Sequence, residues 1–458
     1  MKNKLYEASE NLYFNDGIID YSNIPYSFKN TFPNIFKQAG LNNNDSIMLY
    51  FNDNKLLMSL IIIFNSFKLM IYLANKSVLY KQINNKINKI KFVISDIYFP
   101  NFNERIEKIN ILGKDIYIYY MHNDLNIFKT LKETIFIFYS SGTKGNESKI
   151  ARSKTILLKE ATAIVKTLNW SSDDVILCNA PTFHSFGQAF GCFAALLAQS
   201  RVKYLSSFTL PSHLINELDK NKYSILITTP LYYNQIYEKL LYKDGLKYML
   251  SGGGKLSDKV IKSGIKINNV YGSTETGAVS IQKYILGGNC GSVGTPLKGV
   301  QIKLGNVSYV KNNFKICELI VNSNFIYTGR IENNRIIFNK TKKFKLGDIG
   351  YYDQYGNLQI FGRKDDIVNI YGEKISLNEI EIIMLKCSLI DCIKIQKKED
   401  PYGNDYLIAY ITTNEKCEVE DILIFCRAHL DYYKIPKKII ILEDLKRTET
   451  GKIIYEQN

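Results

Sequence analysis

Histidine and proline are scarce in this sequence, and its cysteines form no pattern that would hold a metal. The 458 residues include four His, nine Pro and eight Cys. There is no CxxC pair and no Cys/His cluster with the ligand spacing of zinc, which argues against a zinc site. Several Cys lie in apolar runs, as Cys178 does in VILCNA, and reduced, buried thiols are typical of cytoplasmic proteins. The low Pro content also excludes collagen-like and linker-like chains.

Long uninterrupted apolar runs are missing as well. The opening segment MKNKLYEASENLYF contains no apolar core, so no secretory signal is expected. Residues 56–73 are mostly apolar but include Asn65 and Lys68. This pattern predicts a buried helix rather than a membrane span. We therefore expect a cytoplasmic protein without a transmembrane segment.

Acidic residues are too few to balance the basic ones, and the imbalance is unevenly distributed. The chain has 59 Lys+Arg and 44 Asp+Glu, a formal net charge of +15. Residues 366–458 carry a net charge of −4, so the preceding part carries +19. A basic surface suits nucleotides, an acidic carrier protein, anionic lipid or nucleic acid. Because no RNA- or DNA-binding motif accompanies the charge, we expect no nucleic-acid partner; a basic nucleic-acid-binding protein is the non-enzymatic alternative.

The order of apolar patterns predicts an α/β protein of more than one domain, because single cores stop growing near ~250–300 residues. From about residue 135, short apolar strands alternate with helical patterns such as 157–168, which indicates parallel βαβ units. The expected strands are 133–139, 175–179, 225–229, 248–250 and a segment that ends at Val270. Between 300 and 345, period-2 strands separated by Asn-rich turns predict a small β-rich subdomain.

After residue 366 the pattern changes to a compact alternation of strands and helices, over a length usual for a domain. The net charge changes sign at the same place. We therefore predict a large N-terminal domain at 1–364, built of parallel βαβ sheets with the β-rich subdomain at about 300–345. A small, mobile α+β domain is predicted at 365–458.

Two motifs have the composition of phosphate-binding loops. YSSGTKGNESK (139–149) lies between a predicted strand and a predicted helix, and its glycines, hydroxyls and lysines offer donors to phosphate oxygens. It lacks the GxxxxGK[ST] spacing of a Walker A loop, so a plain turn is the alternative. YGSTETG (271–277) places the Glu275 carboxylate beside the hydroxyls of Thr274 and Thr276, which suits a phosphate-bound Mg²⁺. A turn with a helix N-cap is the alternative there.

Two further motifs, KLGDIGYYDQYGNLQIFGRKDD (345–366) and KRTETGK (446–452), are uninformative individually. In this order, however, the four motifs resemble those of the adenylate-forming superfamily, which includes acyl-CoA synthetases, luciferases and peptide-synthetase adenylation domains. SGGGKLSDKV (251–260) resembles the adenine-binding segment of that family, and NIYGEKISLNEIE (369–381) follows the family's spacing. The resemblance covers residues 130–458, whereas the first 130 residues match poorly.

Three positions depart from the family's pattern. The phosphate loop has NESK where the family has a residue, Pro and Lys, which displaces Lys149 by one position. Leu346 stands where a Thr or Ser usually precedes the Gly-Asp pair, and Lys446 replaces a Pro. None of the three removes a charge that the chemistry needs.

The resemblance implies a nucleotide-binding role for each matching residue. The triphosphate would be held by Ser140, Ser141, Gly142, Thr143, Lys144, Gly145 and Lys149. The adenine slot would be formed by Gly253, Gly254, Lys255, Tyr271 and Gly272. Thr274 would touch phosphate and Glu275 would hold Mg²⁺. Asp348 would bind the ribose hydroxyls, helped by Arg363.

The resemblance also implies the reaction. With ATP and Mg²⁺, a carboxylic acid would be activated as acyl-AMP with release of pyrophosphate, and then passed to the pantetheine thiol of coenzyme A or of a phosphopantetheinyl acyl carrier protein. Lys452 would reach the reacting carboxylate and α-phosphate, where a cation stabilises the developing negative charge. Asp365 would be the hinge that exchanges Lys452 for Gly372, which would line the pantetheine tunnel.

The segment NAPTFHSFGQAFG (179–191) resembles the acyl-pocket segment of acyl-CoA and acyl-carrier-protein synthetases. His184 would sit at the pocket mouth, although a packed core His is the alternative. Small residues, Gly187 among them, would leave room for a chain or a ring. The segment contains no acidic residue of the kind that binds an amino group, so amino acids are disfavoured. We prefer a fatty acid, hence a role in fatty acid metabolism, with an aryl-acid or amino-acid adenylation enzyme that loads a carrier protein as the alternative.

Overall fold

The computed structural model describes residues 18–24, 26–85, 90–100, 105–111, 113–121, 131–141, 147–206, 209–282, 292–311, 314–333, 335–370, 373–400 and 405–445. The chain divides into two compact units, which are described separately. Unit 1 consists of Met1–Cys290, Gly294–Gln301 and Asn322–Phe344. Unit 2 consists of Gly291–Val293, Ile302–Val321 and Lys345–Asn458.

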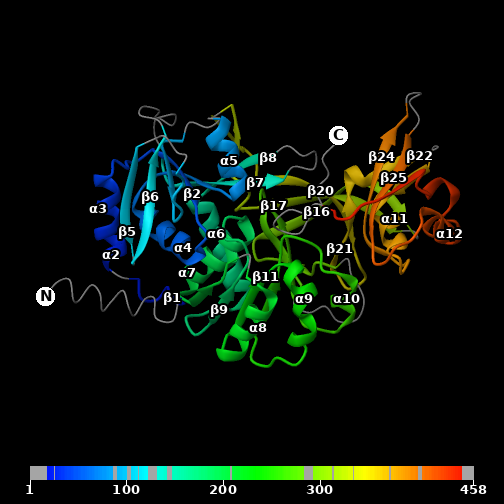
Figure 1. Ribbon diagram of the computed structural model, residues 1–458, viewed down its shortest axis with the longest axis horizontal. Coiled ribbons are helices and arrows are strands. Elements are labelled where there is room, and N and C mark those ends of the chain that lie inside the picture. The colour runs from blue at the N-terminus through cyan, green and yellow to red at the C-terminus, as the bar shows by residue number, and fades with distance from the viewer. Residues whose placement is uncertain are drawn as a thin grey trace. The chain divides into compact units, whose positions relative to one another are not determined.

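Unit 1 contains an eight-stranded sheet whose central strands are parallel (Figure 1). Its order is β1 (Ile18–Asp20), β10 (Arg201–Tyr204), β9 (Val175–Cys178), β11 (Ile225–Thr228), β12 (Tyr248–Ser251), β13 (Asn268–Ser273), β14 (Gly277–Ile281) and β15 (Thr295–Pro296). Helices α8 (Pro211–Lys220), α9 (Pro230–Leu240) and α10 (Asp258–Lys262) pack against it through a core that includes Leu177, Leu226 and Tyr233. The parallel βαβ arrangement predicted from the apolar pattern is confirmed.

A second sheet of unit 1 has nine strands. Its order is β19 (Arg335–Phe338), β18 (Gly329–Glu332), β8 (Glu147–Ser153), β7 (Ile135–Ser141), β3 (Met70–Leu73), β2 (Ser46–Tyr50), β4 (Phe92–Ser95), β6 (Lys114–Tyr120) and β5 (Ile106–Ile111). The strand β2 is buried along its whole length, because it lies between two parallel neighbours and below helices. Such strands are mostly apolar on both faces rather than alternating, as SIMLY is after Ser46. The other helices of unit 1 are α2 (Tyr26–Lys29), α3 (Thr31–Gln38), α4 (Asn54–Ile63), α5 (Lys76–Asn85), α6 (Lys154–Leu168) and α7 (Ala195–Ala198).

The single helix expected over residues 56–73 is only partly present. Helix α4 starts after Asp53, whose side chain accepts the N–H of Leu56, and it ends at Ile63. A short 3₁₀ turn follows, and the last four residues of the range form β3. Asn65 and Lys68 are exposed in this connection, which is where the apolar pattern breaks. In the described part of the chain, no helix has the length and apolarity to cross a membrane.

Two strand boundaries differ from those predicted. Strand β7 starts at Ile135 rather than at residue 133, because the Glu133 carboxylate instead accepts the N–H of Thr155 at 2.7 Å, in the first turn of α6. Strand β13 runs past Val270 to Ser273 and pairs with β14 as an antiparallel hairpin. Helix α6 itself begins after the Ser153 cap and ends at Asn169, which adopts a left-handed conformation with φ of 49°.

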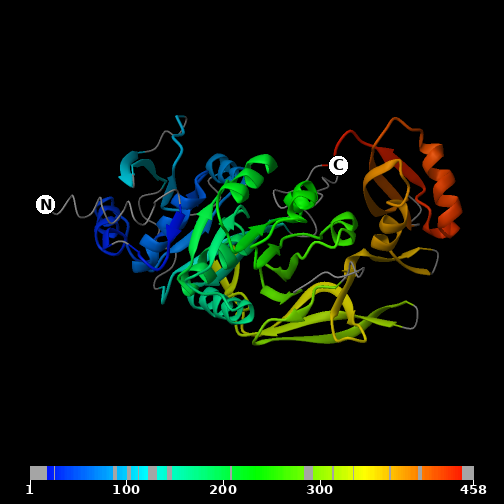
Figure 2. The ribbon, with the colours of Figure 1, turned by 90° about the horizontal axis from the view of Figure 1, so that it is seen from below.

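Unit 2 contains a four-stranded sheet and a compact α+β body. The sheet order is β16 (Val300–Lys311), β17 (Phe314–Ser323), β20 (Lys343–Tyr352) and β21 (Leu358–Arg363). The α+β body holds the hairpin β22 (Ile367–Ile370)–β23 (Glu373–Ser376), the sheet β24 (Ile390–Glu399)–β25 (Asp405–Thr413)–β26 (Lys438–Ile441), and helices α11 (Leu377–Met384) and α12 (Val419–His429). Both helices lie against the three-stranded sheet (Figure 2). They bury apolar side chains in a shared core.

The strands expected between 300 and 345 are present, but they belong to two sheets. Strands β16 and β17 lie in the four-stranded sheet, whereas β18 and β19 extend the nine-stranded sheet through the pairing of Gly329 with Ala151. Local apolar period cannot distinguish these destinations, since both sheets accept the same alternation. The domain boundary at 364/365 stays a prediction.

Candidate active site

The phosphate loop predicted at 139–149 connects two antiparallel strands. Ser140 and Ser141 end β7, and Lys149 lies on β8, where it is paired in register with Tyr139. Gly142, Thr143, Lys144 and Gly145 lie outside the described residues. The expectation that a helix follows the loop directly is wrong, because β8 intervenes before α6 starts at Lys154. Donors for an anion at this loop would therefore come from the loop itself rather than from a helix N-terminus.

The predicted metal motif forms the tight turn of the β13–β14 hairpin. The Ser273 N–H donates to the Thr276 hydroxyl at 3.1 Å, and the Thr276 N–H donates to the Ser273 hydroxyl at 3.2 Å. Thr276 is fully buried, whereas Thr274 and Glu275 are half-buried. The alternative of a helix N-cap is wrong, because residues 277–281 form a strand. The reciprocal hydrogen bonds fix the backbone that carries Thr274 and Glu275.

The segment that leads into β18 also holds Glu275. The Tyr327 N–H donates to the Glu275 carbonyl oxygen at 2.7 Å. The Arg330 guanidinium lies 4.0 Å from the Glu275 carboxylate, and its carbon lies 5.7 Å from the centre of the Tyr327 ring. A carboxylate and a cation thus stand side by side at this turn, an arrangement that suits polyphosphate with its metal.

The predicted adenine segment follows β12. Gly253, Gly254 and Lys255 come directly after Ser251 and Gly252. The ring of Phe186 packs so closely on Gly252 that a Cβ there would lie 2.6 Å from two ring carbons. The structure therefore brings the predicted acyl segment to the start of the predicted adenine segment. Tyr271 and Gly272 lie on the neighbouring strand β13, which pairs with β12.

The predicted acyl segment becomes fully buried from Gly187 onward. Phe183, His184 and Phe186 are half-buried, whereas all residues of the π-helix η3 (Gly187–Ala194) are buried. The His184 ring lies 4.6 Å from that of Phe183, and its backbone N–H donates to the carbonyl of Pro181 at 3.2 Å.

The lack of a side chain at Gly187 has a packing explanation. Its Cα faces the carbonyl group of Pro181, which fills the space of a Cβ. Gly191 likewise packs on Cys178, whose sulfur would lie 2.8 Å from an added Cβ. The inference that these small residues leave room for substrate is therefore corrected: protein atoms occupy that room. The acyl-binding roles of His184 and Gly187 stay predictions.

In unit 2 the predicted ribose residues form an ion pair. Asp348 on β20 is opposite Arg363 on β21, and the Arg363 Nη1 donates to the Asp348 carboxylate at 2.8 Å. The same nitrogen donates to the carbonyl of Leu346 at 3.0 Å. Two neighbouring strands thus orient one carboxylate, so that it can accept hydroxyl hydrogens from a fixed position.

The predicted hinge residue Asp365 is exposed in a short 3₁₀ turn, Lys364–Asp366. Lys364 is tied to the four-stranded sheet, since its Nζ donates to the buried carboxylate of Glu318 on β17 at 2.8 Å. This hydrogen bond, together with the charges of Lys364 and Lys345, lowers the pKa of Glu318. The chain is therefore anchored immediately before Asp365. Gly372 and Lys452 lie outside the described residues.

A second contact joins the sheet to the body that follows Asp365. The Tyr309 hydroxyl donates to the Glu379 carboxylate on α11 at 3.1 Å, and Lys311 forms an ion pair with the same carboxylate. Burial and the Glu379 charge raise the pKa of Tyr309 to about 12. Tyr309 and Lys311 also lie over the ring of Phe361, at 5.2 and 5.5 Å.

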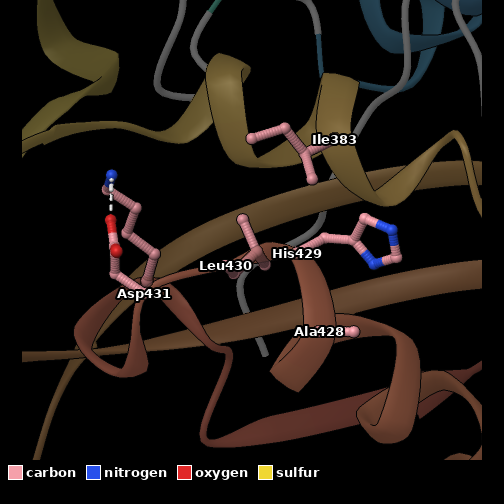
Figure 3. A pocket seen from close by; sticks show the side chains of 6 residues that line it. Ile383, Ala428, His429, Leu430 and Asp431 are labelled. Atoms are coloured by element: carbon pink, nitrogen blue, oxygen red, sulfur yellow. Dashed lines mark hydrogen bonds and ion pairs between the residues drawn. The ribbon is translucent and has the colours of Figure 1, made fainter.

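A shallow hollow lies between α11 and α12 (Figure 3). Ile383, Ala428 and Leu430 form its apolar part, and the Lys434–Asp431 ion pair of 2.6 Å lies at its edge. The His429 ring stacks on Phe425, with ring centres 4.1 Å apart. None of the predicted site residues that the structure describes lines this hollow.

Sequence reasoning missed three charged residues at the predicted site, Arg152, Glu160 and Arg330. Arg152 on β8 and Glu160 on α6 form a fully buried ion pair of 2.8 Å, next to Gly277. Arg330 was missed because an Arg in a short strand has no distinguishing local pattern. The sequence holds no local signal for the buried pair, because the strand ESKIARS already contains the charged Glu147 and Lys149 and nothing local connects Arg152 to residue 277.

The comparisons with known proteins agree with the motifs. The sequence profile of the family described as AMP-binding enzyme matches residues 95–329, more than half of the chain. The chain therefore belongs to the AMP-binding enzyme family, within the adenylate-forming superfamily. The prediction of an AMP-forming acid–thiol ligase is confirmed at this level.

Particular relatives carry one recurring activity. The 2-succinylbenzoate–CoA ligase of Listeria monocytogenes serovar 1/2a is 26% identical over 333 residues, which cover 69% of this chain and 67% of the relative. The enzyme of that name from Bacillus cereus is 26% identical over 315 residues, 65% of this chain and 64% of the relative. The alignments thus span about two thirds of each relative.

Solved structures show the same fold. The o-succinylbenzoate CoA synthetase MenE of Bacillus subtilis, in complex with the acyl-adenylate intermediate OSB-AMP, superposes with a TM-score of 0.76 at 17% identity and covers 93% of this chain and 90% of that one. ATP-bound MatB from Rhodopseudomonas palustris gives 0.71 at 18% identity and covers 92% and 89%. The α/β fold prediction is confirmed.

Proposed function

We propose that this protein activates an aromatic carboxylic acid with ATP, as acyl-AMP, and transfers the acyl group to coenzyme A. The observation that carries the proposal is the braced turn at 273–277, which presents Thr274 and Glu275 on a fixed backbone. Arg330 beside Glu275 supplies a further charge of the kind that a nucleotide substrate requires. Preorganised charge of this kind is the main contribution of a protein to phosphoryl and adenylyl transfer.

An aromatic acid is favoured over a fatty acid for two reasons. The relatives quoted above are named for 2-succinylbenzoate, an aromatic acid. In this chain, the half-buried Phe183, His184 and Phe186 offer ring surfaces, against which an aromatic substrate would pack well.

Coenzyme A is favoured over a carrier protein as the acceptor. The same relatives are CoA ligases by name. The basic charge of the chain before residue 366 suits the phosphates of CoA and an acidic carrier protein alike, so the preference rests on these relatives.

The residues present fit a magnesium ion that arrives with ATP. Among the described residues, no cluster of three or more His, Cys, Asp or Glu could hold a metal by itself. Glu275 offers one half-buried carboxylate, and Mg²⁺ in such sites takes one or two carboxylates together with phosphate oxygens and water. Bound there, the ion would neutralise charge on the phosphates, while Thr274 and Arg330 orient them.

The test is ATP–pyrophosphate exchange across a panel of acids. The panel contains 2-succinylbenzoate, simple benzoates, fatty acids of increasing length and amino acids. We expect exchange with at least one aromatic acid and thioester formation with coenzyme A but not with carrier protein. Exchange with fatty acids only would replace the aromatic proposal, and no exchange with any acid would refute the activity.

We expect Glu275→Gln to slow adenylation and to raise the Mg²⁺ concentration at half-maximal rate. The amide keeps the shape of the side chain but removes the charge that attracts the cation, and lost charge contacts of this kind cost about 10²–10³ in rate. The measurement is a Mg²⁺ titration of exchange at saturating ATP. Glu332→Gln, on the exposed end of β18, is the matched control. An unchanged Mg²⁺ titration for Glu275→Gln would remove the metal from this residue.

A further inference from the structure

We propose that the buried Arg152–Glu160 pair is a positioning device for the turn that carries Thr274 and Glu275. This inference rests on the proposed function and assigns a role to two residues that contact neither substrate nor metal. Their side chains are 0% and 1% exposed, and Nη1 of Arg152 lies 2.8 Å from Oε2 of Glu160.

The Glu160 carboxylate is divided between two partners. While Oε2 faces Arg152, Oε1 accepts the backbone N–H of Ala278 at 2.7 Å. Ala278 is the second residue of β14 and directly follows the turn. A charged acceptor makes this a strong hydrogen bond in a buried setting, so the end of the turn is fixed to α6.

Arg152 holds a different segment: its Nη2 donates to the carbonyl of Phe325 at 3.0 Å. Two residues later, the Tyr327 N–H donates to the Glu275 carbonyl at 2.7 Å. The following N–H, of Thr328, donates to the Ala151 carbonyl at 2.8 Å. Arg152 thus fixes the segment that holds Glu275 from the other side.

The pair also packs closely against the turn itself. Gly277 has a φ of +67°, and a Cβ there would lie 2.6 Å from Oε1 of Glu160 and 2.8 Å from Nη2 of Arg152. The turn therefore rests directly on the two charged groups.

Stability alone does not account for the pair. Replacing a buried ion pair by apolar residues of similar volume is often neutral or stabilising, whereas removing one partner leaves an uncompensated charge. The contribution of the pair is therefore the position it gives to the turn. A small misplacement of a substrate-positioning group costs up to about 10²-fold in rate.

Two double variants separate the geometric role from folding. Arg152→Met/Glu160→Gln removes both charges but keeps an amide oxygen that can accept the Ala278 N–H. Arg152→Met/Glu160→Leu removes that acceptor as well. Both should melt near the wild-type temperature. The Leu variant should show about 10- to 100-fold slower exchange and a raised Mg²⁺ requirement, with the Gln variant closer to wild type and the KM for the acid unchanged in both.

Controls and a second readout make the test independent of the acid. Lys203→Met/Glu217→Gln removes another ion pair of unit 1, of 2.9 Å, away from the turn, and should leave exchange unchanged. Calorimetric binding of MgATP should weaken in the Leu variant and not in this control. Gly277→Ala, which pushes the turn off an intact pair, should weaken MgATP binding too and serves if the Leu variant does not fold.

Wild-type Mg²⁺ dependence and MgATP affinity in a folded Leu variant would overturn the inference. Failure of the proposed function is distinguishable, because wild-type protein would then exchange with no acid in the panel. MgATP binding by the variants would still test the positioning role in that case.

Discussion

Lys452→Ala is expected to abolish formation of acyl-AMP while leaving thioester formation from supplied acyl-AMP largely intact. Lys452 ends the motif KRTETGK, which resembles the segment that delivers a lysine to the reacting carboxylate and α-phosphate. Charge builds up there only in the adenylation step, and loss of a principal charged contact costs about 10²–10³ or more in rate. The two half-reactions are measured separately, as pyrophosphate exchange and as CoA-dependent consumption of acyl-AMP.

Lys446→Ala is the matched control for this prediction, because it removes a lysine from the same motif at a position where the family has a Pro. It should leave both half-reactions near wild type. A loss of equal size in both half-reactions of Lys452→Ala would contradict the division of roles.

Asp365→Pro is expected to stop acyl transfer to coenzyme A while the fold stays intact. A hinge residue absorbs a large change of φ and ψ, and the proline ring fixes φ near −65°. Proline also restricts the preceding Lys364, which the Glu318 carboxylate already holds at 2.8 Å. Adenylation should survive if the variant is fixed in the arrangement that forms acyl-AMP.

The control is Asp365→Ala, which removes the same carboxylate without restricting rotation and should transfer acyl groups normally. Circular dichroism and melting of both variants should match wild type, because residue 365 is exposed and outside any core. Transfer by Asp365→Pro at the wild-type rate would show that no rotation about this residue is needed.

Much of the fold could be predicted because its strands are short, apolar and locally distinct. The runs at 175–179, 225–229 and 248–250 became β9, β11 and β12, since a strand buried between parallel neighbours needs no polar face. The pairing of β18 with β8 could not be predicted, because it joins residues 329 and 151 and neither strand has a pattern specific to its partner.

The candidate site divides in the same way. Glu275, Asp348 and Arg363 could be predicted as site residues because each belongs to a motif of contiguous residues. The Glu160–Ala278 hydrogen bond spans 118 positions, so only the folded chain shows it. At Gly187 the lack of a side chain suggested space for substrate. In the fold, the carbonyl group of Pro181 fills the space that a side chain would take, and the sequence does not show this contact.

The contact of Glu379 with Tyr309 and Lys311 bears on the equilibrium between the two arrangements that a rotation about Asp365 would connect. A rotation about Asp365 would separate α11 from β16, so this contact would break and reform in every catalytic cycle. The Lys311 and Glu379 side chains are 44% and 22% exposed, and ion pairs of that exposure contribute about 0–1 kcal/mol. Such a contact changes the ratio of two populations by only about fivefold. It would favour one arrangement without trapping the protein in it, and salt would weaken that preference.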